Sequence, residues 1–131
     1  MCSIFGASYP HLDMPELSVL AEMLRETWDL CRERGRDGSG WATQHHAYRW
    51  FEDLAGAAID VAGLRHGRWI VGNRRAEPTT EFVLSKRKSD QQPYCLGPWV
   101  VVHNGTVAND KELRTGELET SIDSAAIAEQ L

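Results

Sequence analysis

Apolar residues recur at every third or fourth position between residues 14 and 34, which is the period of one buried helix face. They are Leu17, Leu20, Ala21, Leu24, Trp28 and Cys31. Asp13 and Pro15 are typical of a helix start, and Gly35 is typical of a helix stop. The sequence therefore predicts a helix that follows Asp13 and runs to about Arg34.

Short apolar runs between polar turns predict strands. A strand is expected over residues 2–8, ending at Tyr9-Pro10. The runs Trp69–Gly72 and Trp99–His103 are typical of buried strands. Gly35–Gly40 predicts a glycine-rich turn, from which a less regular strand leaves over 41–48.

The remaining segments are less regular. Residues 49–66 fit either a short helix or a strand, and Lys86–Gln92 predicts a polar surface loop. Residues 110–114 and 122–131 predict helices. The last of these helical patterns has no Gly, Asn or Pro at its end, so we expect the sequence to be truncated at its C-terminus.

Composition narrows the class of protein. The chain has 131 residues, 42% of them hydrophobic, and a net charge of −5, which fits one globular domain and excludes a disordered chain. The acidic balance argues against nucleic-acid binding. No apolar run is long enough for a membrane span or a signal peptide, so a cytoplasmic protein is expected. Cys2, Cys31 and Cys95 lack C-x-x-C spacing, so neither disulfides nor a metal site is expected, and no cofactor is predicted.

Cys2 is a candidate nucleophile because of its position. Removal of Met1 would place a thiol and a free α-amine on one residue, so that the amine could serve as the base for the thiol. The alternative is a small residue that simply starts a strand, and position alone favours that alternative.

Three further polar groups follow strands or precede a helix. Asn104 and Gly105 come directly after an apolar strand, where an amide and a backbone N–H could stabilise an oxyanion, although Asn-Gly is also a common turn. Arg74 or Arg75 could bind a carboxylate, or belong to a solvated basic loop. Asp123 could bind an ammonium group, or cap the last helix.

The order of these motifs resembles the class II glutamine amidotransferase domain, a family of N-terminal nucleophile (Ntn) hydrolases, over essentially all of residues 1–131. The resemblance rests on five segments: Met1–Gly6, Arg34–Gly40, Gly72–Arg75, His103–Gly105 and Ser121–Asp123. It implies an α+β fold, an αββα four-layer sandwich, of which this chain holds the N-terminal catalytic portion. Missing strands would then leave an exposed sheet edge, so poor folding in isolation is expected.

The resemblance also implies an enzyme and a role for each site residue. Cys2 would attack the side-chain amide of L-glutamine, form a glutamyl thioester and release ammonia. Asn104 and Gly105 match the oxyanion pair, and Arg75 matches the ligand of the glutamine carboxylate, with Arg74 as the choice if the alignment shifts by one residue. Asp123 matches the ligand of the glutamine ammonium group.

Two departures and two alternatives accompany this interpretation. Ala76 stands where the family commonly has a large hydrophobic residue, and residues 77–80 also differ from the better-known enzymes. The ammonia acceptor would be a synthetase or transferase domain or subunit that residues 1–131 do not contain. The alternatives are a stand-alone amidohydrolase on another γ-glutamyl compound and a degenerate domain kept for binding or assembly.

Overall fold

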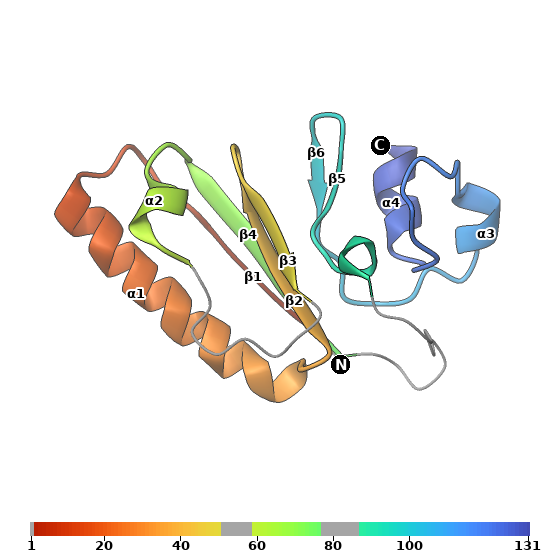
Figure 1. Ribbon diagram of the computed structural model, residues 1–131, viewed down its shortest axis with the longest axis horizontal. Coiled ribbons are helices and arrows are strands. Elements are labelled where there is room, and N and C mark those ends of the chain that lie inside the picture. The colour runs from red at the N-terminus through yellow and green to blue at the C-terminus, as the bar shows by residue number, and fades with distance from the viewer. Residues whose placement is uncertain (1, 51–58, 77–86) are drawn as a thin grey trace.

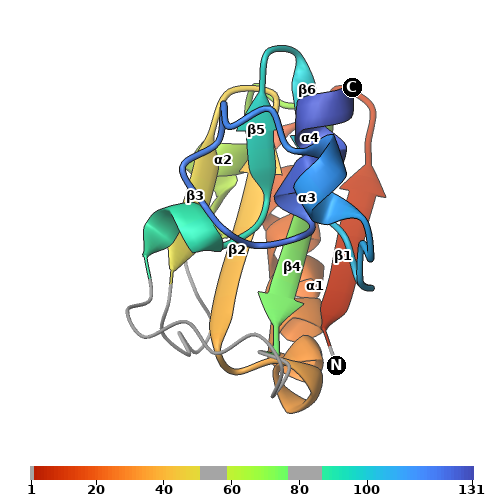
Figure 2. The same cartoon turned by 90° about the vertical axis from the view of Figure 1, so that its right-hand side faces the viewer.

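The computed structural model describes residues 2–50, 59–76 and 87–131, which form four layers (Figure 1). Figure 1 shows α1 and α2 in the first layer, a four-stranded sheet in the second, a two-stranded hairpin in the third, and α3 and α4 in the fourth. Figure 2 turns the hairpin and the last two helices toward the viewer, in front of the larger sheet. The chain is therefore an α+β protein with antiparallel sheets.

The larger sheet has the order β1-β4-β2-β3, and every pair in it is antiparallel. Its strands are β1 (Ser3–Ser8), β4 (Trp69–Arg75), β2 (Gly38–Thr43) and β3 (Ala47–Trp50). The strands expected over 2–8 and from Trp69 are confirmed, and β4 continues three residues further than predicted, to Arg75. This extension brings Arg74 opposite Ser3, beside the first residues of the chain.

Helix α1 (Met14–Cys31) covers one face of this sheet, and a 3₁₀ turn, Arg32–Arg34, continues it to Gly35. The predicted helix and its start are confirmed: Asp13 accepts a hydrogen bond from the Glu16 backbone N–H, and the Glu16 carboxylate accepts one from the Asp13 N–H. The apolar stripe of the helix forms a core with the sheet. That core includes Leu17, Ala21, Leu24, Trp28, Phe5, Trp41 and Ile70.

The second half of the described chain forms a smaller unit. Strands β5 (Tyr94–Leu96) and β6 (Trp99–Val101) pair as a hairpin, against which α4 (Ala125–Gln130) packs. Helix α3 (Asp110–Leu113) lies beside α4. Tyr94, Ile122, Ala125 and Ala128 form its separate apolar core. The strand expected from Trp99 is confirmed but is not a buried one, because Trp99 is 47% exposed; strand β5 was not predicted.

Two predictions about polar segments are wrong in part. Gly38 and Gly40 do not lie in a turn but in the fully buried strand β2. Of the surface loop expected over 86–92, Arg87 and Lys88 are exposed and Lys86 lies outside the described residues. Asp90, Gln91 and Gln92 are instead buried, because their segment packs onto the face of β2 that is turned away from α1. Both differences have one cause, since glycines on that face let a second chain segment approach the strand.

The less regular segments of the sequence contain the end of one strand and three short helices. Residues 49–66, which fitted either structure, contain the end of β3 and the short helix α2 (Val61–Leu64), while residues 51–58 lie outside the described part of the chain. The helices expected over 110–114 and 122–131 are confirmed as the shorter α3 and α4. None of the helices among the described residues is both long and apolar enough to cross a bilayer.

A single methyl group at Gly40 tests this packing. A Cβ there would lie 2.1 Å from the Gln92 carbonyl oxygen and 2.6 Å from that of Tyr48, and neither backbone atom can rotate away. We expect Gly40→Ala to lower the free energy of unfolding by about 1–3 kcal/mol, measured by urea denaturation. In Gly38→Ala the methyl group meets the end of the Gln91 side chain, so a smaller loss is expected. Equal losses for both variants would contradict this account.

Candidate functional site

A cavity of about 190 Å³ lies where the end of the larger sheet meets the smaller unit. All five residues predicted to form a site line it, although they come from four separate segments of the chain. Its lining consists of Cys2, Arg75, Ala76, Gln92, His103, Asn104, Gly105, Thr106, Ile122, Asp123 and Ser124. The structure thus brings the predicted residues together, while the role of each one stays a prediction.

Cys2 lies at the cavity because β1 pairs with the end of β4. The register places Ser3 opposite Arg74, and the buried Asn73 donates a hydrogen bond from Nδ2 to the Ser3 carbonyl, at 3.2 Å. The partly buried Cys2 thiol donates a weak hydrogen bond to the Ala76 carbonyl, with Sγ and O 3.6 Å apart. The pairing of β1 with β4 therefore fixes both the backbone next to Cys2 and the Ala76 carbonyl that the thiol contacts.

Alternation along β4 separates the two neighbouring arginines. Arg74 faces α1, where its Nε donates to the Gly35 carbonyl at 3.2 Å and its guanidinium lies 5.1 Å from the centre of the Trp28 ring. Arg75 faces the opposite side, as successive strand residues do, and lines the cavity. Of the two arginines left open by the sequence, Arg75 is the one at the cavity.

The segment Arg34–Gly40, one of the five on which the resemblance rests, contacts the end of β4. The Asp37 N–H donates to the Arg75 carbonyl at 2.9 Å, and a Cβ at Gly35 would lie 2.4 Å from the Arg74 carbonyl oxygen. Glycine at position 35 therefore permits the close approach of the α1 end to β4. Residues 77–80, which differ from the better-known enzymes of the family that the sequence resembles, lie outside the described residues.

Asn104 and Gly105 follow β6, and their position depends on Gln92. The Gln92 side chain accepts a hydrogen bond from the His103 N–H at 2.6 Å and donates one to the His103 carbonyl at 3.1 Å. Gln92 is buried, and its backbone is held against Gly40 of β2. The Gln92 side chain thus hydrogen-bonds to the backbone just beyond the end of the hairpin. It thereby fixes the position of the chain immediately before Asn104 and Gly105.

Asp123 is buried, and both its carboxylate oxygens already accept hydrogen bonds from the chain. Oδ2 accepts from the Val107 N–H at 2.5 Å, and Oδ1 accepts from the Ser124 N–H at 2.7 Å and the Ser124 hydroxyl at 3.2 Å. The helix cap offered as its alternative role is not observed, because Ser124 is the N-cap of α4 and no side chain caps it. Asp123 instead ties the loop after Gly105 to the start of α4.

Sequence reasoning assigned no role to four polar residues of the cavity wall: Gln92, His103, Thr106 and Ser124. His103 Nδ1 lies 3.0 Å from the Ser124 hydroxyl, which itself donates to Asp123. The signal available in the sequence was a histidine between an apolar strand and Asn-Gly. Nothing in the sequence pattern placed Ser124 or Gln92 beside it.

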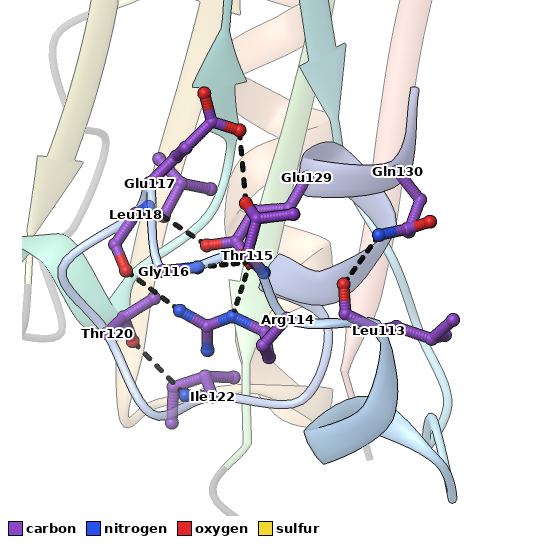
Figure 3. A network of polar contacts seen from close by, with 10 residues as sticks. All are labelled: Leu113, Arg114, Thr115, Gly116, Glu117, Leu118, Thr120, Ile122, Glu129 and Gln130. Carbon is purple, nitrogen blue, oxygen red and sulfur yellow. Dashed lines mark hydrogen bonds and ion pairs between the residues drawn. The ribbon is translucent and has the colours of Figure 1, made fainter.

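Glu129 of α4 anchors the loop that leads back toward Asp123 (Figure 3). Its carboxylate accepts hydrogen bonds from Arg114 Nε, at 2.8 Å, and from three backbone N–H groups, those of Thr115, Gly116 and Leu118. Burial by itself would raise the pKa of Glu129, but the hydrogen bonds from Arg114 and from these N–H groups outweigh it and lower the pKa to about 2. The pair is a buried one, since the Glu129 side chain has no exposed surface.

Three curated relatives resemble this chain, and the same activity stands in all three names. A 7-cyano-7-deazaguanine synthase of Saccharolobus solfataricus is 35% identical over 97% of this chain and 29% of its own length. One of Sulfolobus acidocaldarius is 52% identical over 86% of this chain and 26% of its own. The 7-cyano-7-deazaguanine synthase 2 of Sulfurisphaera tokodaii is 46% identical over 44% of this chain and 13% of its own. The chain spans less than a third of the length of these relatives.

These names contradict the identification as a class II glutamine amidotransferase. The predicted enzyme, its L-glutamine substrate, its ammonia-accepting partner and both alternative functions are corrected accordingly, because the relatives are named as synthases of 7-cyano-7-deazaguanine. The physical reason is that the resemblance rested on five short segments. Several of their residues have packing roles in this fold, such as Gly40 against Gln92 and Asp123 on Val107.

No family model matches the chain, and no solved structure does. The Ntn-hydrolase assignment and the treatment of residues 1–131 as one domain therefore stay predictions. Among the described residues, no three His, Cys, Asp or Glu side chains are grouped so that they could hold a metal ion.

Proposed function

We propose that this chain takes part in the synthesis of 7-cyano-7-deazaguanine, as a portion of a longer synthase polypeptide. The observation that carries the proposal is the similarity to the synthase of Saccharolobus solfataricus, which extends over 97% of the chain at 35% identity. The 52% identity to the synthase of Sulfolobus acidocaldarius over 86% of the chain supports the same activity.

Within that synthesis, the cavity at Cys2 serves as the site of a small, polar reactant. A volume of about 190 Å³ lies below the ~300–1,000 Å³ of sites that enclose drug-sized ligands, so the reactant is a small one. Arg75 supplies a guanidinium for an anionic group of that reactant. The lining is otherwise rich in amide, hydroxyl and backbone groups, which suits a polar molecule.

The thiol of Cys2 supplies the nucleophile in this site. It attacks an electrophilic carbon of the reactant, and the negative charge that develops is stabilised by Asn104 and by the Gly105 N–H. Asp123 orients its neighbours through the hydrogen bonds that its carboxylate accepts from Val107 and Ser124. The site residues predicted from the sequence thus keep their place in the proposal, with a different reactant.

We place the protein in the cytoplasm. All three cysteines are free, although each is partly accessible. Free thiols of this kind are typical of a reducing compartment.

The test is genetic complementation with a chemical readout. The complete gene product is expressed in a strain that lacks its own 7-cyano-7-deazaguanine synthase, and the compound is quantified by mass spectrometry. We expect the gene product to restore 7-cyano-7-deazaguanine and an empty vector to give none. Folded gene product in cells that still lack the compound would overturn the proposed function.

A further inference from the structure

His103 is held in one position by its backbone. Both its N–H and its carbonyl are paired with the amide of Gln92, which is only 2% exposed. Because Gln92 is in turn packed against Gly40, the start of the His103 side chain is fixed relative to the larger sheet. The backbone of His103 therefore cannot move away from the cavity, and only the rotation of its side chain is left for other contacts to fix.

The orientation of the ring is set by Ser124 and Asp123. A carboxylate only accepts hydrogen bonds, so the single hydrogen of the Ser124 hydroxyl is the one shared with Asp123, over 3.2 Å. The Ser124 oxygen is then an acceptor for His103, whose Nδ1 lies 3.0 Å away. This order of donors requires hydrogen on Nδ1 and, in the neutral ring, leaves the lone pair on Nε2.

The opposite edge of the ring lies against Gly105 at the cavity wall. A Cβ added at Gly105 would lie 2.9 Å from His103 Nε2 and 3.1 Å from Cε1. Glycine at this position therefore leaves free the space beside Nε2 that a methyl group would fill. His103 and Gly105 line the same cavity as Cys2.

We propose that His103 is the proton-transfer residue of the Cys2 cavity and that Ser124 and Asp123 are positioning residues that hold its Nδ1–H tautomer. The inference rests on the proposed function. As the Cys2 sulfur attacks the reactant, its S–H proton passes to His103 Nε2, giving an imidazolium that keeps its Nδ1–H on Ser124. When the bond between the attacked carbon and its leaving group breaks, the Nε2 proton passes to the leaving group. The reactant stays bonded to the Cys2 sulfur, and the ring returns to its starting form.

The charged and titratable groups around the ring are drawn from three sides of the cavity. Cys2 comes from the segment before β1, Arg75 from the end of β4 and Asp123 from the segment before α4. The Arg75 guanidinium brings a positive charge to the cavity, and the Asp123 carboxylate brings a negative charge that reaches the ring through Ser124. This distribution of charge supports transfer of a proton from sulfur to nitrogen.

The experiment measures the alkylation rate of Cys2 by iodoacetamide in the complete gene product, from pH 5 to pH 10, with peptide mass spectrometry to separate Cys2 from Cys31 and Cys95. We expect His103→Gln to slow alkylation near neutral pH by roughly tenfold, since a thiol without a nearby base is only a few per cent thiolate there. Ser124→Ala is expected to slow it less, and His11→Gln, an exposed residue outside the cavity, to leave it unchanged.

A second variant keeps the proposal testable if His103→Gln does not fold. Gly105→Ala retains the backbone N–H but places a methyl group on Nε2, so it is expected to reproduce the slower alkylation. Selective ¹⁵N labelling of histidine is expected to show the Nδ1–H tautomer at His103 in the wild type and its loss in Ser124→Ala. An Nε2–H tautomer in the wild type, or identical pH profiles in the wild type and His103→Gln, would overturn the inference.

The two proposals fail in different ways. If product formation survives in a Cys2→Ala variant, the proposed site is wrong, whatever the state of His103. If product formation requires Cys2 while His103→Gln keeps the wild-type rate and pH profile, only the role of His103 is wrong.

Discussion

Replacement of Cys2 by alanine is expected to abolish the formation of 7-cyano-7-deazaguanine by the complete gene product. The thiol is the only strong nucleophile among the side chains of the described cavity, and no neighbour can replace it. Removal of a covalent nucleophile costs several orders of magnitude in rate, so product is expected to fall by roughly a hundredfold or more. The measurement is the amount of product in the complemented strain.

Two controls separate chemistry from folding in this experiment. Cys2→Ser retains a donor for the Ala76 carbonyl, so it is expected to fold normally and still lose the activity. Cys95→Ala removes a thiol from β5 that does not line the cavity, and product formation is expected to persist. Full activity in both Cys2 variants would show that the thiol has no part in the synthesis.

Loss of the Glu129 carboxylate is expected to give the largest change in stability. The pKa of Glu129 is lowered from 4.5 to about 2, so the carboxylate stabilises the folded chain above pH 4.5 and loses that effect as the pH falls toward 2. A shift of this size corresponds to about 3 kcal/mol. We expect Glu129→Gln to lower the free energy of unfolding by roughly this amount at pH 7, measured by urea denaturation.

The pH dependence gives a sharper result than the value at one pH. Between pH 5 and pH 2.5 the wild type is expected to lose more stability than Glu129→Gln, so the two curves converge in acid. Glu119→Gln is the matched control, because Glu119 pairs with Arg87 at the surface, where the two side chains are 88% and 60% exposed. Such pairs contribute about 0–1 kcal/mol. Parallel curves for the wild type and Glu129→Gln would contradict the assigned hydrogen bonds.

Local patterns were enough to predict α1 and β1. The helix was predictable because its apolar stripe is regular and because its capping residue, Asp13, acts within a few neighbouring residues. Gly38 and Gly40 were misread because the same residue type serves turns and crowded strands. Only the segment at Gln91 and Gln92, some fifty residues away in the sequence, distinguishes the two uses.

The site residues were likewise predictable where neighbouring residues decide, and not where contacts between distant segments decide. Spacing along the chain suggested Cys2, Asn104, Gly105 and Asp123, but it could not decide between Arg74 and Arg75, because that choice depends on which face of β4 is turned to α1. It also could not show that Asp123 is occupied by Val107 and Ser124. The predicted activity was wrong because short motifs do not specify a reaction: the same few residue types recur in proteins with different reactions.

The division of the cavity between two units has a consequence for the order of events during synthesis of the chain. Cys2 leaves the ribosome before the rest of the cavity, because its partner Ala76 is 74 residues later in the chain and Asp123 is later still. Contacts this distant form only after long loops close. A nascent chain that has folded its first sheet therefore holds the thiol beside Arg75 and Ala76 only, and the rest of the cavity is completed when Asp123 and α4 have emerged.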